Sequence, residues 1–193
     1  MNLPNFLTLS RIVFTFIFMY FLFSPGIFSK FMAIFIFLLA SFTDYYDGYL
    51  ARKKNLVTNF GKLMDPIADK ILVLSAFLAF VEMKLMPAWM AIIIISRELL
   101  ITGIRILSLA NGKVIPAMRA GKHKTVYQFF AIITTLIFIT LREIILGKNL
   151  WNNFLEKVFH QTIFFLLFLA TIFTLVSGIN FLYHHRFFLW KDN

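Results

Sequence analysis

Six apolar stretches, each about as long as a membrane-spanning helix, follow one another along this chain. A helix needs about 20 apolar residues to cross a hydrocarbon core of roughly 30 Å. The stretches fall at 9–28, 31–51, 67–83, 87–109, 125–146 and 158–182, and hydrophobic residues make up 60% of the 193. They are too long and continuous for barrel strands, which alternate over about ten residues. The sequence therefore predicts an all-α membrane protein, a single domain over residues 1–193 with six transmembrane helices.

The basic residues predict the orientation of these helices. They gather in the second and fourth connections, which contain Arg52, Lys53, Lys54, Lys62, Lys113, Arg119, Lys122 and Lys124. By the positive-inside rule, these connections and both termini face the cytoplasm. The connection at 142–157 is a partial exception, with three cations and two glutamates. Orientation and anionic lipid explain the net charge of +10, so no nucleic-acid partner is expected. The opening segment, 2–11, is a candidate for a short interfacial helix.

Four of the five aspartates fall within 26 residues, at the adjoining ends of the second and third apolar stretches. They are Asp44, Asp47, Asp65 and Asp69. Spacings of three and four place each pair on one face of a helix. Four carboxylates at membrane depth repel one another and cost several kcal/mol each unless cations neutralise them. Two divalent ions would balance their charge.

The donor atoms favour a hard metal ion. The chain has no cysteine, and its four histidines lie elsewhere in the sequence, so Mg²⁺, Mn²⁺ or Ca²⁺ is expected before zinc. Magnesium is the first choice because it commonly combines a few carboxylates with substrate phosphates. An alternative for Asp65 is structural, because Asp followed by Pro66 is typical of a helix start.

The complete pattern reads Asp44-x2-Asp47-Gly48-x2-Ala51-Arg52-x8-Gly61-x3-Asp65-x3-Asp69. It resembles the signature of the CDP-alcohol phosphatidyltransferase family, with every fixed position present. The resemblance implies six transmembrane helices, a homodimer in the bacterial cytoplasmic membrane, and a cytoplasmic cavity holding one or two metal ions. It also implies transfer of a phosphatidyl group from CDP-diacylglycerol to an alcohol.

The resemblance further implies a role for each residue of the pattern. Asp44, Asp47 and Asp65 would ligate the metals, two Mg²⁺ or alternatively Mn²⁺, that hold the CDP pyrophosphate. Asp69 would complete the metal site and act as general base on the acceptor hydroxyl. The implied CDP-binding residues are Gly48, Ala51, Arg52 and Gly61, together with Asn5 and Thr8 near the start of the chain.

A second basic set predicts an acceptor that carries phosphate. Arg97 and Arg105 are eight apart on the fourth predicted helix, and Lys122 and Lys124 begin the fifth. Convergent Arg and Lys suit a phosphate dianion. An alternative is that Arg97 pairs with Glu98 and that the lysines only mark the lipid headgroups.

Three segments, 94–105, 121–125 and 2–5 with Thr8 and Arg11, resemble the bacterial phosphatidylglycerophosphate synthase branch, which implies glycerol-3-phosphate as acceptor. Inositol phosphate, serine or phosphatidylglycerol remain alternative acceptors. From another class, a divalent-cation transporter would also use intramembrane carboxylates. Transporters often contain inverted repeats, whereas the halves 1–96 and 97–193 show no second acidic cluster.

Overall fold

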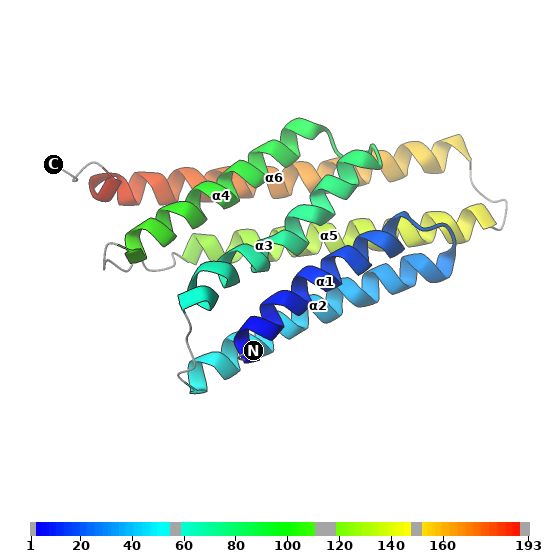
Figure 1. Ribbon diagram of the computed structural model, residues 1–193. Helices are drawn as coiled ribbons and strands as arrows, with labels where there is room; N and C mark the ends of the chain where they lie inside the picture. The colour runs from blue at the N-terminus through cyan, green and yellow to red at the C-terminus, as the bar shows by residue number, and fades with distance from the viewer. Residues whose placement is uncertain (1–2, 55–58, 111–118, 148–151, 190–193) are drawn as a thin grey trace.

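The computed structural model describes the backbone of residues 3–54, 59–110, 119–147 and 152–189, and the side chains of 9–43, 68, 70–108, 124–147 and 152–185. The described backbone is helical apart from short turns (Figure 1). Its helices are α1 (Leu3–Phe23), α2 (Ile27–Lys54), α3 (Asn59–Glu82), α4 (Ala88–Ala110), α5 (Arg119–Gly147) and α6 (Asn153–Leu189). The predicted all-α fold is confirmed for these residues.

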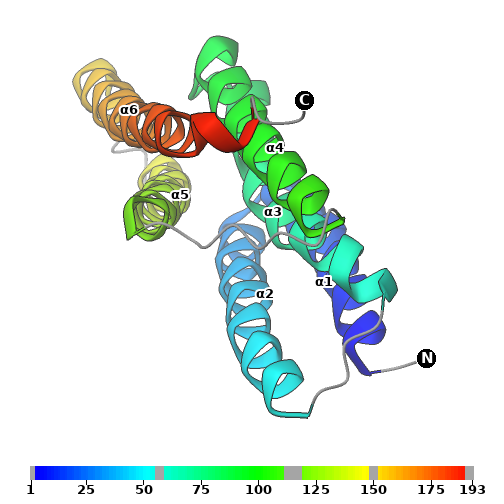
Figure 2. The same cartoon turned by 90° about the vertical axis from the view of Figure 1, so that its left-hand side faces the viewer.

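The helices alternate in direction along one bundle. The ends of α2, α4 and α6 and the beginnings of α3 and α5 lie toward the same end, at the left of Figure 1, and Figure 2 views the bundle from that end. Helix α1 packs on α2 and α3, α3 packs on α4, and α5 packs on α2, α3 and α6. This alternation brings the helix ends that carry the aspartates to the same end of the bundle as the start of α5.

The first helix differs from the prediction at both ends. It begins at Leu3 and continues unbroken to Phe23, so no separate interfacial helix forms. Pro4 lies in the first turn, where it removes no hydrogen bond. The predicted stretch 9–28 was too long, because the helix ends before a turn that contains Pro25 and Gly26, the latter with φ 95°.

Lys30 closes the turn between α1 and α2. Its buried Nζ donates to the carbonyl of Leu22 at 2.7 Å and to that of Ser24 at 2.9 Å. A cation at the last carbonyls of a helix satisfies them and complements the helix dipole. A capping role therefore explains this lysine at the end of the bundle remote from the basic connections.

The turn between α3 and α4 is a Schellman motif with lysine at its left-handed position. Lys84 has φ 58°, its amide donates to Val81 at 2.9 Å, and the amide of Leu85 donates to Phe80 at 2.9 Å. Glycine usually occupies this position. The two hydrogen bonds satisfy carbonyls at the end of α3 and fix the direction in which α4 leaves.

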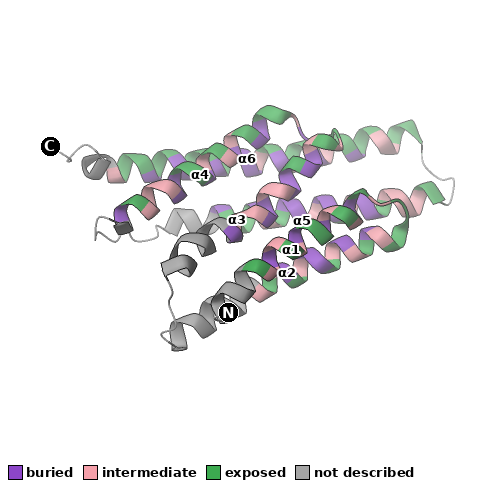
Figure 3. Ribbon diagram, in the orientation of Figure 1, coloured by how far each residue is buried: buried purple, intermediate pink, exposed green. Residues whose placement is uncertain are grey.

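Large apolar side chains form the core and also cover the outer surface. Phe18, Phe37, Phe77 and Phe80 are fully buried, whereas many other apolar side chains are exposed on outward helix faces (Figure 3). Soluble monomers rarely expose large contiguous apolar surface. Two described segments, Lys124–Gly147 and Asn153–His185, are long and apolar enough to cross a membrane. Six spans remain a prediction.

Candidate active site

The aspartate pattern lies on two helices that contact each other. Asp44 and Asp47 belong to α2, Asp65 and Asp69 belong to α3, and these helices pack together. Because α3 begins at Asn59, Asp65 lies inside the helix, and the alternative that it caps a helix start is wrong. The four side chains lie outside the described residues, so their convergence on a metal stays a prediction.

The implied nucleotide-binding residues lie on the same helices or on α1. Gly48, Ala51 and Arg52 belong to α2, Gly61 to α3, and Asn5 and Thr8 to α1, which packs against both. Their side chains, like that of Lys122 in α5, lie outside the described part of the chain. Among the side chains that are described, no group of three or more His, Asp or Glu could hold a metal ion.

A buried carboxylate, Glu98 of α4, gathers cations from three helices. Its Oε1 accepts a hydrogen bond from Nη1 of Arg97 at 3.1 Å and one from Nζ of Lys124 in α5. Its Oε2 lies 3.7 Å from Nζ of Lys70 in α3. The side chains of Arg97, Lys124 and Glu98 are each at most 10% exposed. We call these four residues, Lys70, Arg97, Glu98 and Lys124, the Glu98 cluster.

The sequence offered a pairing of Arg97 with Glu98 as an alternative to phosphate binding. The structure contains this pair, and Glu98 has further cationic partners. Arg97 does pair with Glu98, and so does Lys124. Three cations nevertheless share one carboxylate. Among the described side chains, the Glu98 cluster thus carries two more positive charges than negative ones, and excess charge is costly where it is as buried as at Arg97 and Lys124. The role of Arg97 and Lys124 in binding phosphate stays a prediction.

Arg97 is fixed against α6. Its Nη2 donates to Oγ of Ser177 at 2.9 Å. The side chain also crosses Gly178 so closely that a Cβ at this glycine would lie 2.9 Å from Cγ of Arg97. A glycine at this position therefore leaves the space that the arginine occupies. With Nη1 on Glu98, both terminal nitrogens of the guanidinium have defined partners.

Gln128 connects the cluster to a buried threonine. Its Nε2 lies 3.4 Å from Oε1 of Glu98 and 3.0 Å from Oγ1 of Thr174. Gln128 stands four residues after Lys124, so both side chains leave α5 on the same face. Neither Gln128 nor Lys70 was predicted as a site residue. The sequence offered two signals for them: Gln128 is four residues after Lys124, and Lys70 directly follows Asp69.

Arg105 makes its described contact with a ring of α6, outside the hydrogen bonds and ion pairs of the Glu98 cluster. Its guanidinium carbon is 5.5 Å from the ring centroid of Phe181 in α6, a cation–π contact. The eight-residue spacing from Arg97 corresponds to about 12 Å along a helix. Its Nε is buried and has no hydrogen-bond partner among the described atoms. Arg105 therefore joins the phosphate-binding set only as a proposal.

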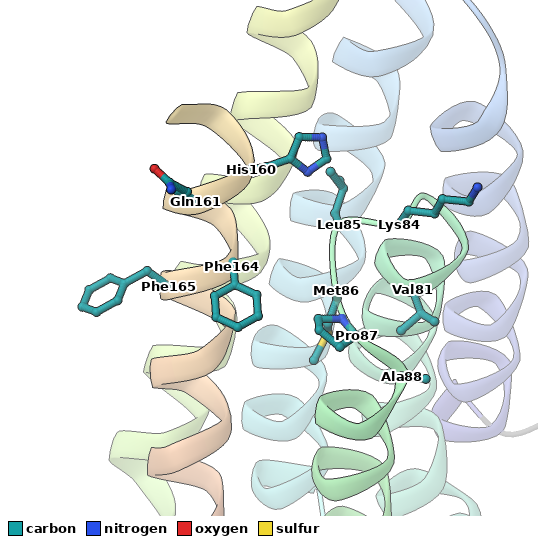
Figure 4. Close-up of a pocket in the computed structure, with 10 residues that line it drawn as sticks. All are labelled: Val81, Lys84, Leu85, Met86, Pro87, Ala88, His160, Gln161, Phe164 and Phe165. Atoms are coloured by element: carbon teal, nitrogen blue, oxygen red, sulfur yellow. The ribbon is translucent and has the colours of Figure 1, made fainter. Parts of the chain in front are cut away.

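A separate hollow lies between the α3–α4 turn and α6 (Figure 4). It has a cavity volume of about 730 Å³ and is lined by Val81, Lys84, Leu85, Met86, Pro87, Ala88, His160, Gln161, Phe164 and Phe165. In Figure 4 the side chains of Lys84, Gln161 and Phe165 point away from it. Its lining contains no carboxylate, and it has little in common with a phosphate or metal site.

The structure is thus a helical bundle with the acidic pattern on α2 and α3 and a cluster of cations around Glu98, and its similarity to known proteins identifies the family. The profile of the CDP-alcohol phosphatidyltransferase family matches residues 1–184. The chain belongs to this family.

Similar proteins include three named CDP-diacylglycerol--glycerol-3-phosphate 3-phosphatidyltransferase. The Bacillus subtilis protein is 43% identical over 148 residues, which cover 70% of this chain and 77% of the relative. The Rickettsia bellii protein is 35% identical over 93% of both chains. The Haemophilus influenzae protein is 36% identical over 94% of this chain and 91% of its own length.

Two glycine substitutions test how tightly Arg97 is held. We expect Gly178→Ala to destabilise the protein, because the new methyl group displaces Arg97 from Ser177 and Glu98. Gly103→Ala is the matched control, since nothing lies within 4 Å of its Cβ position, and it should stabilise α4 by about 0.5–1 kcal/mol. Thermal unfolding in detergent measures both. Equal stabilisation by the two alanines would show that Arg97 moves aside freely.

Proposed function

We propose that this protein transfers the phosphatidyl group of CDP-diacylglycerol to sn-glycerol-3-phosphate, giving phosphatidylglycerophosphate and CMP. Three relatives named for this reaction align with 70%, 93% and 94% of the chain. The structural observation that carries the proposal is the Glu98 cluster, because its two excess positive charges match a phosphate monoester dianion. Serine offers no such group. Family membership also favours a transferase over the cation transporter.

The acceptor lies between two sets of residues in this proposal. Its phosphate contacts Lys70, Arg97 and Lys124, with Arg105 and Lys122 at the edge of the site. Lys70 follows Asp69 along α3, so the two residues lie at nearly the same level of the bundle, about 1.5 Å apart along the helix axis. In this proposal a small acceptor reaches from the cluster to Asp69. Positioning of this kind removes much of the entropic barrier to reaction.

Asp69 then accepts the proton of the attacking hydroxyl. The acceptor oxygen forms a bond to the phosphorus that carries diacylglycerol, and the bond from that phosphorus to the CMP oxygen breaks. Asp44, Asp47, Asp65 and Asp69 hold the divalent metal, two Mg²⁺ or alternatively Mn²⁺, since hard carboxylate oxygens suit these ions. Such a metal would supply positive charge to the leaving phosphate. Gly48, Ala51, Arg52, Gly61, Asn5 and Thr8 bind the CDP portion.

We also infer the membrane arrangement from the bundle. All six helices cross the bilayer, with both termini and the site on the cytoplasmic side of the bacterial membrane. The exposed apolar faces and the common end shared by α2, α4 and α6 support this arrangement. The protein acts as a homodimer, as its family resemblance implies.

The proposed reaction predicts a specific pattern of CMP release. Purified protein with CDP-diacylglycerol and Mg²⁺ should release CMP at least about 100-fold faster with glycerol-3-phosphate than with serine, because serine leaves the cationic site unpaired. Inositol phosphate and phosphatidylglycerol are the further acceptors to compare, and chelation with EDTA should stop release. Faster turnover with any of the other three alcohols would contradict the proposed acceptor.

The base assignment predicts the effect of Asp69→Asn. The amide cannot take a proton, so kcat should fall by about 10²–10⁴-fold. CDP binding, followed by equilibrium dialysis with Mg²⁺ present, should persist. Asp192→Asn is the matched control, because it removes the one aspartate outside the pattern, and it should leave kcat unchanged. Normal turnover by Asp69→Asn would rule out the proposed base.

A further inference from the structure

Glu98 joins helices whose backbones do not meet. Within the described residues, α4 and α5 make no close backbone approach, although each packs on α3 and α6. The hydrogen bonds of Lys124 and Gln128 to Glu98 cross this gap. Between α4 and α5 themselves, the described contact at this level is therefore made by side chains, whereas α3 and α6 hold the two backbones.

The three cations differ in how firmly the rest of the fold holds them. Arg97 is fixed by Ser177 and by its packing on Gly178. Lysine carries its charge on a flexible four-carbon chain, and among the described side chains Glu98 is the acidic partner of both Lys70 and Lys124. Without the negative charge, the three cations would repel one another. The lysines would then turn toward water or other partners.

We propose that Glu98 is a positioning residue, whose carboxylate gathers Lys70, Arg97 and Lys124 into the arrangement that binds the phosphate of the acceptor. This inference rests on the proposed function, in which the acceptor carries phosphate. Glu98 does not contact the reacting atoms. It acts through the two lysines and the arginine.

The number of cations distinguishes this role from that of a structural ion pair. A structural pair balances one charge with one charge, whereas Glu98 is shared among cations from α3, α4 and α5. Its Oε1 is crowded by three donors, while Oε2 faces Lys70. The carboxylate reduces the repulsion among the cations and still leaves two positive charges for a ligand.

The test compares Glu98→Gln with a matched change elsewhere. Glutamine has nearly the same shape and lacks the charge, so the KM for glycerol-3-phosphate should rise about tenfold or more. The KM for CDP-diacylglycerol and kcat at saturating acceptor should stay within about twofold. Glu156→Gln is the control, because Glu156 is half-exposed in an ion pair with Arg142, 4.0 Å away. It lies in the first turn of α6, and α6 begins at the end of the bundle opposite to the end of α4 (Figure 1). This control should change neither KM.

A second readout requires no turnover. Inorganic phosphate should raise the thermal unfolding temperature of the unmodified protein and of Glu156→Gln, and should have little effect on Glu98→Gln. Glu98→Asp keeps the charge on a shorter side chain, so its KM for glycerol-3-phosphate and its stabilisation by phosphate should be intermediate. If Glu98→Gln inserts poorly into the membrane, the KM and the phosphate stabilisation of Glu98→Asp test the positioning role in its place.

Three results would overturn the positioning role. They are an unchanged KM for glycerol-3-phosphate in Glu98→Gln, equal losses for both substrates, and phosphate stabilisation that is the same with and without the carboxylate. Absence of glycerol-3-phosphate turnover in the unmodified protein would instead refute the proposed function. In that case the phosphate measurement still tests the role of Glu98.

Discussion

One buried carboxylate connects most of the charged side chains that the structure describes in the interior of the bundle. Glu98 lies where α3, α4 and α5 each bring a cation into an apolar bundle, and it contacts all three. Burying a carboxylate without a partner costs free energy of folding. Removing it once its cationic partners are buried also destabilises the protein, because it leaves their charges unpaired. Two nearby polar side chains are linked to Glu98. Gln128 lies within hydrogen-bond distance of its carboxylate, and Ser177 accepts a hydrogen bond from its partner Arg97. The glycine at 178 leaves room for that arginine.

This network also relates the two parts of the proposed active site. The acidic pattern ends at Asp69, and the Glu98 cluster begins at the next residue, Lys70. Helix α3 therefore carries groups of both kinds, and it packs on α1, α2, α4 and α5. A helix with so many neighbours is a rigid support. In the proposed reaction this support holds the phosphate of the acceptor in place while the hydroxyl of the acceptor attacks.

Much of the fold could be read from the sequence, because the length of an apolar stretch limits what it can form. The helices α2, α5 and α6 contain their predicted stretches, and α3 and α4 contain all but one residue of theirs, Met83 and Pro87 in the turn between them. Helix α1 ends earlier than predicted, at the turn made by Pro25 and Gly26. The acidic pattern was recognisable because its spacing is local. The pairing of Glu98 with Lys70 and Lys124 was not, because it joins residues 28 and 26 positions apart on separate helices. Arg105 illustrates the same limit, since its spacing from Arg97 did not reveal that it lies over Phe181.

The most direct test of the account is a double-mutant cycle between Glu98 and Lys124, measured by thermal unfolding in detergent. The single variants are Glu98→Gln and Lys124→Met, and the double variant combines them. If the carboxylate holds this lysine, the double variant should be more stable than the two single losses predict, with a coupling of at least about 1 kcal/mol. Additive losses would contradict the central claim that Glu98 organises the buried cations.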